Sequence, residues 1–501
     1  MTVLSTPTSL GRRGEALLER FGDHESLFFE GRWHRSGELA TRARKAARGF
    51  TELGVRVGDR VVVVMANCPE VGLTYTALWR AGAVPTPALF LLTEDELRHV
   101  VEDSGAVAVV TTPEFLPKVS AAAPGLAIVV VGGEGGIAWE QLEAGDELPL
   151  VDRAGDDLAA LLYTGGTTGR SKGVALTHAS LDAAGFAAAE AAFSPGRNTM
   201  LLPLPLAHAY GLLVTVAGLH SQEASKSVLM RWFDPAGWVS LVEEHRMQAS
   251  ALVPSMIQML LSQPLESHDL SCLERVSSGA APLAPDVIAE FERRIPSCEI
   301  REGYGCTESS ALISSQPNGE RKSGSVGKAV PGVTIRIELP DGSDAKPGED
   351  GEICVGGNTL MQGYWNSPEA TAFALRDGWL YTGDVGHLDE DGWLYIVDRI
   401  KDLIIRGGFN VYPRDVEDVM LAHPEVVGAA VVGKPDPKLG EEVVAFVQLA
   451  PGATVTPEEL IAYSKEHLGA YKYPRDVRVI DAIPLTSVMK TDRKALRVTL
   501  S

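Results

Sequence analysis

Short runs of apolar residues alternate with amphipathic stretches from about residue 55 onward. In DRVVVVMAN, PEVGLTYTALWRAGAV and DELRHVVEDSGAVAVVTT, continuous β-branched runs precede or follow segments with a period of 3.6 residues. Such runs are typical of strands that helices bury on both faces, as in parallel sheets. The alternation continues through QASALVPS and LERVSSGAAP, so the pattern predicts one or two large α/β layers over about the first 330 residues.

The pattern changes at PGVTIRIELPDGSDAKPGEDGEICVGG, residues 331–357, where apolar positions alternate with a period of two. Pro, Gly and Asp bound these positions, which indicates antiparallel strands joined by turns. The motif DGWLY occurs at 377–381 and again at 391–395, and we interpret the two copies as adjacent strands entered through Asp-Gly turns. The sequence thus predicts a β-rich subdomain over about residues 330–400.

The last hundred residues form a self-contained pattern. PRDVEDVMLAH and TPEELIAYSKEHLG have the helical period, and VVGAAVVG and EEVVAFVQLA have the character of strands. In the second helix Thr456 and Glu459 complete a capping box, and Gly469 is the expected stop. The predicted fold class is α/β, with a large N-terminal body over residues 1–400 and a small α+β C-terminal domain over residues 401–501.

Composition excludes several classes of function. The 501 residues include 66 acidic and 45 basic side chains, for a formal charge of -21, which repels the phosphates of nucleic acids. The five cysteines are scattered without a CxxC pair, so neither a disulfide framework nor a zinc site is indicated. The N-terminus lacks a signal-peptide pattern and no run has the length of a membrane span. We therefore predict a cytoplasmic protein without integral membrane association, and leave a homodimer open.

The stretch DLAALLYTGGTTGRSKGVALTH, residues 157–178, carries the clearest chemical signal. A strand-like run leads into glycines and threonines followed by Lys172, and such a loop can surround phosphate oxygens with backbone N–H groups and hydroxyls. A P-loop is disfavoured, because the position five after Gly165 is Arg170 and the position five after Gly166 is Ser171. A Gly/Thr-rich turn without function stays open from composition alone.

YTGGTTGRSKG resembles the phosphate-loop motif of the adenylate-forming superfamily, which contains acyl- and aryl-CoA synthetases, nonribosomal adenylation domains and luciferases. The chain departs from that motif at Gly165, where serine is usual, and at Ser171, where proline is usual. The remaining motifs follow in family order, and the chain is most similar to the fatty-acid and acyl-CoA ligases. They are PLPLAHAYG, SSGAAPL, EGYGCTES, YTGDVG, VDRIKDLIIRGGFNVYPRDVE and PLTSVMKTDRKALR.

The resemblance implies a reaction with ATP, Mg²⁺ and CoA. A carboxylic acid attacks the α-phosphate of ATP, pyrophosphate leaves, and the acyl-adenylate then passes its acyl group to CoA with release of AMP. Three alternatives stay open: a catalytically silent homologue that binds a nucleotide or acyl-CoA, an acyl-AMP ligase that loads a carrier protein, and oxidation as in luciferases. The departures at Gly165, Ser171 and Met489 motivate the silent homologue, since glycine is usual at the last position.

The resemblance also assigns nucleotide-binding residues. Lys490, His208, Glu308 and Lys172 are the implied catalytic residues. Positions implied to contact ATP or AMP are Thr164, Gly165, Gly166, Thr167, Thr168, Gly169, Lys172, Gly279, Ala280, Ala281, Glu302, Gly303, Tyr304, Gly305, Thr307, Asp384, Arg399 and Lys490. The implied metal ligands are Glu308 and Thr167. For His208 the alternative is a core histidine, and for Asp384 it is an ordinary turn residue.

Further positions are implied for the acid, for CoA and for the hinge. The implied acyl pocket consists of His208, Ala209, Val253, Met256, Ser278, Gly303 and Ala311, and the implied CoA contacts are Arg406, Gly407, Gly408, Lys472 and Arg475. AHAYG lacks the aspartate of amino-acid-activating relatives, and PSMIQMLLS offers no cation for a dicarboxylate. The small apolar pocket therefore predicts a fatty or aryl acid. Lys401 is the implied hinge that makes the C-terminal domain mobile.

Overall fold

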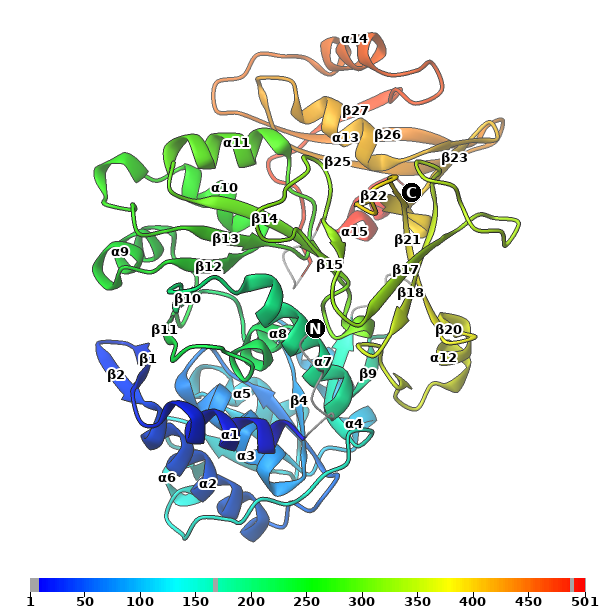
Figure 1. Ribbon diagram of the computed structural model, residues 1–501. Helices are drawn as coiled ribbons and strands as arrows, with labels where there is room; N and C mark the ends of the chain where they lie inside the picture. The colour runs from blue at the N-terminus through cyan, green and yellow to red at the C-terminus, as the bar shows by residue number, and fades with distance from the viewer. Residues whose placement is uncertain (1–8, 165–169, 487–490, 501) are drawn as a thin grey trace. The chain divides into compact units, whose positions relative to one another are not determined.

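The computed structural model describes residues 9–164, 170–486 and 491–500 (Figure 1). The chain divides into two compact units, one of Met1–Ile335 with Val355–Leu380 and one of Arg336–Cys354 with Tyr381–Ser501. The chain passes between them within strands β17 (Val333–Glu338), β18 (Gly351–Gly357) and β21 (Trp379–Leu388). These points differ from the boundary predicted at residue 400, and the hinge at Lys401 stays a prediction.

A sheet of five parallel strands in the order β4-β3-β5-β6-β7 forms the first layer of the larger unit. Its interior strand β3 places four consecutive valines in the core, each 0% exposed, because helices cover both faces as the uninterrupted apolar run predicts. The strands are β3 (Arg60–Val64), β4 (Val84–Pro87), β5 (Ala108–Thr111), β6 (Ala127–Val130) and β7 (Ile137–Ala138). The helices of this region are α1 (Leu10–Phe21), α2 (Ser36–Glu52), α3 (Pro69–Ala81), α4 (Glu94–Ser104), α5 (Leu116–Ala122) and α6 (Trp139–Leu142).

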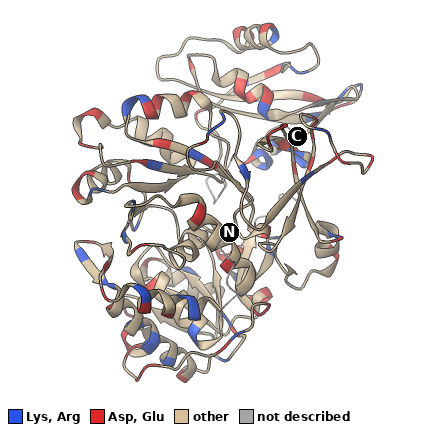
Figure 2. Cartoon of the chain, in the orientation of Figure 1, with Lys and Arg blue, Asp and Glu red and all other residues tan. Residues whose placement is uncertain are grey.

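Charged residues of both signs are interspersed along these helices (Figure 2). On α2, Arg42 contacts Glu70 of α3 at 2.7 Å and Glu143 at 3.0 Å. Arg80 of α3 and Arg44 of α2 share Glu15 of α1. These ion pairs join α1, α2 and α3, so the three arginines stabilise the packing of the helices.

A sheet of nine strands in the order β16-β15-β14-β13-β12-β10-β11-β1-β2 forms the second layer. Strands β1 and β10 to β14 run parallel, and the edge strands β2, β15 and β16 are antiparallel. The strands are β1 (Glu25–Phe29), β2 (Arg32–Arg35), β10 (Thr199–Leu202), β11 (Lys226–Leu229), β12 (Ala249–Leu252), β13 (Arg275–Ser278), β14 (Glu299–Tyr304), β15 (Ser314–Ser315) and β16 (Lys328–Ala329).

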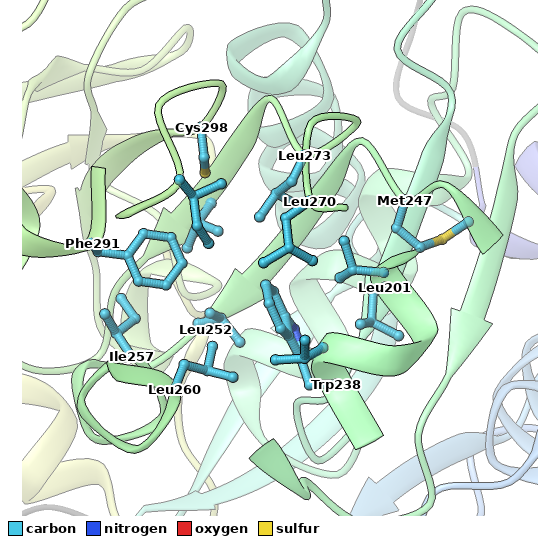
Figure 3. Packing of buried hydrophobic residues seen from close by; sticks show 14 of the residues in the cluster. Leu201, Trp238, Met247, Leu252, Ile257, Leu260, Leu270, Leu273, Phe291 and Cys298 are labelled. Carbon is cyan, nitrogen blue, oxygen red and sulfur yellow. The ribbon is translucent and has the colours of Figure 1, made fainter. Parts of the chain in front are cut away.

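Three helices pack on one face of this sheet: α9 (Pro235–His245), α10 (Pro254–Leu261) and α11 (Pro285–Arg294). Each begins with proline, whose missing N–H is not needed in the first turn. Trp238, Ile257 and Phe291, one from each helix, meet Leu201 and Leu252 of the strands in a single core (Figure 3). Elsewhere in this unit lie α7 (His178–Ala192), α8 (Ala209–Gly218) and α12 (Pro368–Ala374).

Two hairpins follow the duplicated DGWLY motif. Asp377 and Gly378 both have positive φ, as a two-residue hairpin turn requires, and they join β20 (Leu375–Arg376) to the start of β21. The second copy ends in β22 (Leu394–Arg399), which pairs antiparallel with β21. The predicted adjacent strands entered through Asp-Gly turns are therefore present.

The smaller unit contains a mixed sheet in the order β24-β23-β26-β25, with β27 paired to β26. The capping box of Thr456 and Glu459 is confirmed at the start of α14, which ends at His467, two residues before the predicted stop. The strands are β23 (Ile404–Arg406), β24 (Phe409–Val411), β25 (Val426–Asp436), β26 (Gly440–Leu449) and β27 (Asp476–Val479), and the helices are α13 (Pro413–Leu421), α14 (Pro457–His467) and α15 (Arg493–Val498). The α/β class with an α+β unit is confirmed.

Candidate functional site

An antiparallel hairpin of β8 (Leu158–Thr164) and β9 (Lys172–Thr177) carries the predicted phosphate loop. Thr164 and Lys172 are register partners, so they flank the loop on opposite strands. Gly165, Gly166, Thr167, Thr168 and Gly169 lie outside the described residues. The hairpin is extended by β19 (Gly363–Tyr364), which pairs with β9.

Helix α4 braces this hairpin. The ring Nε2 of His99 lies 2.8 Å from the Ser171 carbonyl oxygen, and because a carbonyl only accepts, Nε2 carries the proton. The Tyr163 hydroxyl donates to the Asp103 carboxylate at 2.6 Å, and the Trp365 indole donates to the Asp103 carbonyl at 3.0 Å. With serine at position 171, the hairpin that carries the phosphate loop is still held to α4 by these hydrogen bonds.

Glu308 and Lys172 meet at one tyrosine that the sequence analysis missed. The Tyr364 hydroxyl donates to Glu308 Oε1 at 2.8 Å, and the Lys172 ammonium lies 5.1 Å from the centroid of the same ring. Burial, and then the Glu308 carboxylate, raises the pKa of Tyr364, so its hydroxyl keeps its proton. Thr307 and Glu308 belong to the short 3₁₀ helix η3 (Thr307–Ser309).

The carboxyl ends of β12, β13 and β14 lie at one edge of the nine-stranded sheet. Leu252 pairs with Ser278 and Ser278 pairs with Glu302, so the residues after them gather there. Ligands of open α/β sheets bind outside such edges. The predicted positions on this edge are Val253, Met256, Ser278, Gly279, Ala280, Ala281, Glu302, Gly303, Tyr304 and Gly305.

The backbone at this edge excludes a side chain at Gly305 and leaves little room for one at Gly279. A Cβ at Gly305 would lie 2.3 Å from the Ala311 carbonyl oxygen, and one at Gly279 would lie 3.3 Å from the Gly303 oxygen. Ala280 and Ala311 have φ of 71° and 72°, a left-handed conformation that is uncommon for alanine. Such strain concentrates at functional sites, which agrees with the predicted roles of both alanines.

His208 is held as the N-cap of α8. Its Nδ1 accepts a hydrogen bond from the Tyr210 N–H at 3.2 Å, so this nitrogen is unprotonated. The Tyr210 hydroxyl donates to the Ser277 carbonyl at 3.1 Å, and its ring lies 3.7 Å from the place of a Gly279 Cβ. Ala209, the first residue of α8, lies between them in sequence. Tyr210, absent from the prediction, thus joins the histidine segment to the end of β13.

Val253 and Met256 are half-buried at the start of α10, and Ser278 is 3% exposed. The Ser278 hydroxyl has no hydrogen-bond partner within the described part of the chain. Buried hydroxyls normally have hydrogen-bond partners. Within the described residues, Ser278 therefore adds an unsatisfied polar group to a set whose other two members, Val253 and Met256, are apolar.

In the smaller unit Asp384 and Arg399 are register partners on β21 and β22. Arg399 Nε lies 2.8 Å from Asp384 Oδ1, and the side chains are 44% and 5% exposed, respectively. The carboxylate is therefore pre-oriented by an arginine whose head reaches solvent. The structure brings these two predicted residues together.

Lys401 lies in the 3₁₀ helix η4 (Ile400–Asp402), directly before a buried carboxylate. Asp402 accepts from Arg497 at 3.0 Å and lies 3.8 Å from Arg493, both on α15. Arg493 Nη2 also donates to both carboxylate oxygens of half-buried Glu417, at 2.6 and 2.8 Å. Met489 and Lys490 lie outside the described residues, and α15 begins at Arg493, three positions after Lys490.

The predicted CoA contacts have partners inside the smaller unit. Arg406 forms a bidentate pair with Glu442 at 2.6 and 2.9 Å, and Lys472 pairs with Asp415 at 2.5 Å. The Arg475 guanidinium stacks 3.3 Å from the Tyr473 ring centroid. Gly407 and Gly408, with φ of 59° and 84°, form the two-residue turn between β23 and β24. The turn alone requires these glycines, so contact with CoA stays a prediction.

Two family models match the chain: that of the AMP-binding enzymes over residues 15–365 and that of the AMP-binding enzyme C-terminal domain over residues 415–490. The feruloyl-CoA synthase of Amycolatopsis sp is 38% identical over 455 residues, 90% of each chain. The 4-coumarate–CoA ligase 3 of Oryza sativa subsp. japonica is 35% identical over 487 residues, 93% of this chain and 87% of the relative. The crystal structure of ATP-bound MatB from Rhodopseudomonas palustris superposes with a TM-score of 0.90 at 32% identity, covering 98% of both chains.

The chain therefore belongs to the AMP-binding enzymes, the adenylate-forming family that its motifs resemble. Among these enzymes its relatives are acid–CoA ligases, and the predicted reaction class, activation of an acid followed by transfer to CoA, is confirmed. No helix in the described ranges is both long and apolar enough to cross a membrane.

Proposed function

We propose that the chain is an AMP-forming ligase for an aryl acid of the hydroxycinnamate kind. The observation that carries the nucleotide chemistry is the meeting of Lys172 and Glu308 at Tyr364, beside the hairpin of the phosphate loop. The aryl acid is supported by the relatives that act on ferulate and 4-coumarate. It is also supported by the Tyr210 ring beside Gly279, at the carboxyl edge of the sheet.

In the first half-reaction, a carboxylate oxygen forms a bond to the α-phosphorus of ATP as the bond to pyrophosphate breaks. Both reactants are anions, so the chain contributes positioning and positive charge. We assign Lys172 to the departing phosphates and Lys490 to the carboxylate and α-phosphate. Asp384 and Arg399, already paired, would contact the ribose. In the second half-reaction the CoA sulfur displaces AMP from the acyl carbon.

Glu308 suits a magnesium ion that arrives with the nucleotide. Across residues 9–164, 170–486 and 491–500, no three His, Cys, Asp or Glu side chains are grouped to hold a metal ion. An ion at Glu308 would therefore take most of its ligands from phosphates and water, as Mg²⁺ commonly does. When bound, Mg²⁺ supplies positive charge to the phosphate oxygens. Thr167 as a second ligand, a homodimer and a cytoplasmic location stay predictions from the sequence.

The test is acid-dependent exchange of labelled pyrophosphate into ATP, followed by AMP release with and without CoA. We expect exchange with ferulate and 4-coumarate, weaker exchange with palmitate, and stoichiometric thioester once CoA is added. Exchange without CoA-dependent AMP release would favour a carrier protein as acceptor. Nucleotide binding without exchange for every acid would instead identify a silent homologue.

A further inference from the structure

We propose that Tyr364 is a positioning residue that fixes Lys172 and Glu308 in one arrangement before the nucleotide binds. The inference rests on the proposed function, which gives those two residues their roles. Tyr364 itself lies in no motif that the sequence analysis used. Its contribution arises from two contacts made by different parts of one side chain.

The hydroxyl and the ring of Tyr364 have separate partners. The hydroxyl donates to Glu308 Oε1 at 2.8 Å, and the ring lies under the Lys172 ammonium at 5.1 Å from its centroid. A hydroxyl has one proton to donate, so this contact holds one carboxylate oxygen and leaves the other for a cation. A ring face attracts an ammonium without neutralising its charge.

The tyrosine thus keeps a cation and an anion in one site without pairing them directly. In the described part of the chain neither Lys172 nor Glu308 has an ion-pair partner. A direct Lys–Glu pair would satisfy both charges and would have to break before phosphates and Mg²⁺ could bind. An aromatic spacer avoids that cost, so both groups stay available to the ligand.

The backbone around Tyr364 holds this spacer rigidly. The Met361 N–H donates to the Glu308 carbonyl at 2.8 Å, and the Trp365 N–H donates to the Gly173 carbonyl at 2.7 Å. The Tyr364 N–H donates to Thr371 Oγ1 at 2.9 Å. The segment is therefore bonded to the turn that carries Glu308 and to the strand that begins at Lys172. Partners that orient a metal ligand in this way commonly contribute tenfold or more to metal affinity.

The test separates the hydroxyl from the ring. In the full chain Tyr364→Phe keeps the ring under Lys172 and removes the bond to Glu308. Calorimetric titration of ATP at a series of Mg²⁺ concentrations then measures binding without turnover. We expect the Mg²⁺ concentration for half-maximal ATP affinity to rise about tenfold, while ATP affinity in EDTA stays within about twofold. Excess Mg²⁺ should restore the rate of pyrophosphate exchange.

The matched control is Trp365→Phe, which removes one hydrogen bond, to the Asp103 carbonyl, from the next residue of the same segment. An unchanged Mg²⁺ dependence in this control, beside the shift in Tyr364→Phe, supports positioning. An equal shift of the Mg²⁺ dependence in both variants would overturn this inference. So would the absence of a shift in Tyr364→Phe. If the unchanged chain exchanges pyrophosphate normally, the proposed function would still stand. Absence of Mg²⁺-dependent ATP binding in the unchanged chain would overturn the proposed function and this inference with it.

Discussion

At the scale of single residues, the site depends on backbone geometry as much as on charge. Gly305 is required because Ala311 approaches within 2.3 Å of where its side chain would begin. Ala280 and Ala311 adopt a conformation that glycine would enter without strain. The sequence indicated that this edge needs small residues, but the alanines' left-handed backbone has no local signature. The turns that the chain makes at Ala280 and Ala311 impose this left-handed conformation.

His178 gives the larger unit a dependence on pH. The side chain is 1% exposed, and burial, followed by the nearby charge of Arg153, lowers its pKa from 6.5 to about 4. Because the folded pKa lies below the unfolded one, the neutral histidine favours folding above pH 6.5, and this contribution is lost as pH falls toward 4. The loss amounts to roughly 1.4 kcal/mol for each pH unit.

We therefore expect His178→Gln to unfold at a lower Tm than the unchanged chain at neutral pH and to approach it near pH 4. Glutamine can still accept the hydrogen bond that His178 Nδ1 takes from the Leu10 N–H at 3.3 Å. Thermal melts of both proteins across this range measure the difference. A gap in Tm that is constant with pH would show that His178 does not titrate with unfolding.

At the scale of elements, local patterns predicted the strands and caps well, since β-branched runs and capping boxes depend on neighbours in sequence. Contacts that complete the site were not predictable in this way. Tyr364 and Glu308 are 56 residues apart, and Asp402 and Arg497 are 95 apart. Their meeting is decided by how β19 adds to β9 and how α15 packs. The sequence supplied the charged motif residues, and the fold supplied the partners that orient them.

Asp402 is the residue through which α15 is attached to η4. Asp402→Asn removes the charge that faces Arg497 and Arg493 while keeping the size of the side chain. A buried carboxylate with such partners contributes about 2 kcal/mol, so we expect a lower Tm for the smaller unit. Hydrogen exchange in residues 491–500 should also become faster.

The matched control is Asp476→Asn, which removes a pair to Arg478 whose side chains are 36% and 35% exposed. Exposed pairs contribute little, so this variant should resemble the unchanged chain. Equal effects of the two substitutions would mean that Asp402 has no special part in holding α15.

At the scale of the whole molecule, the two half-reactions require different groups at the reacting atoms. Lys490 is assigned only to adenylate formation, and a mobile small domain would remove it before CoA arrives. This arrangement follows from the motif and from the proposed hinge at Lys401. Lys401 lies inside the smaller unit, which also contains residues 381–399, so the hinge stays a prediction from the motif.

Lys490→Ala should therefore lower acid-dependent pyrophosphate exchange by at least about 100-fold, the usual effect of losing a charge-stabilising group. Transfer from supplied acyl-adenylate to CoA should stay within a few fold of the unchanged rate. Lys494→Ala, an exposed lysine on α15 four positions later in the sequence, is the control and should leave both rates intact. Equal loss of both half-reactions in Lys490→Ala would refute the assignment.

The chain crosses from one compact unit to the other within strands. This limits where two such enzymes can be joined in a chimera. The Arg414 N–H donates to the Asp398 carboxylate at 3.0 Å, and its guanidinium donates to the Ile396 carbonyl at 3.0 Å. A gene crossover at residue 400 would place these partners on different parental sequences. A chimera that keeps the parents' own pairs must exchange residues 336–354 and 381–501 together, as a discontinuous module.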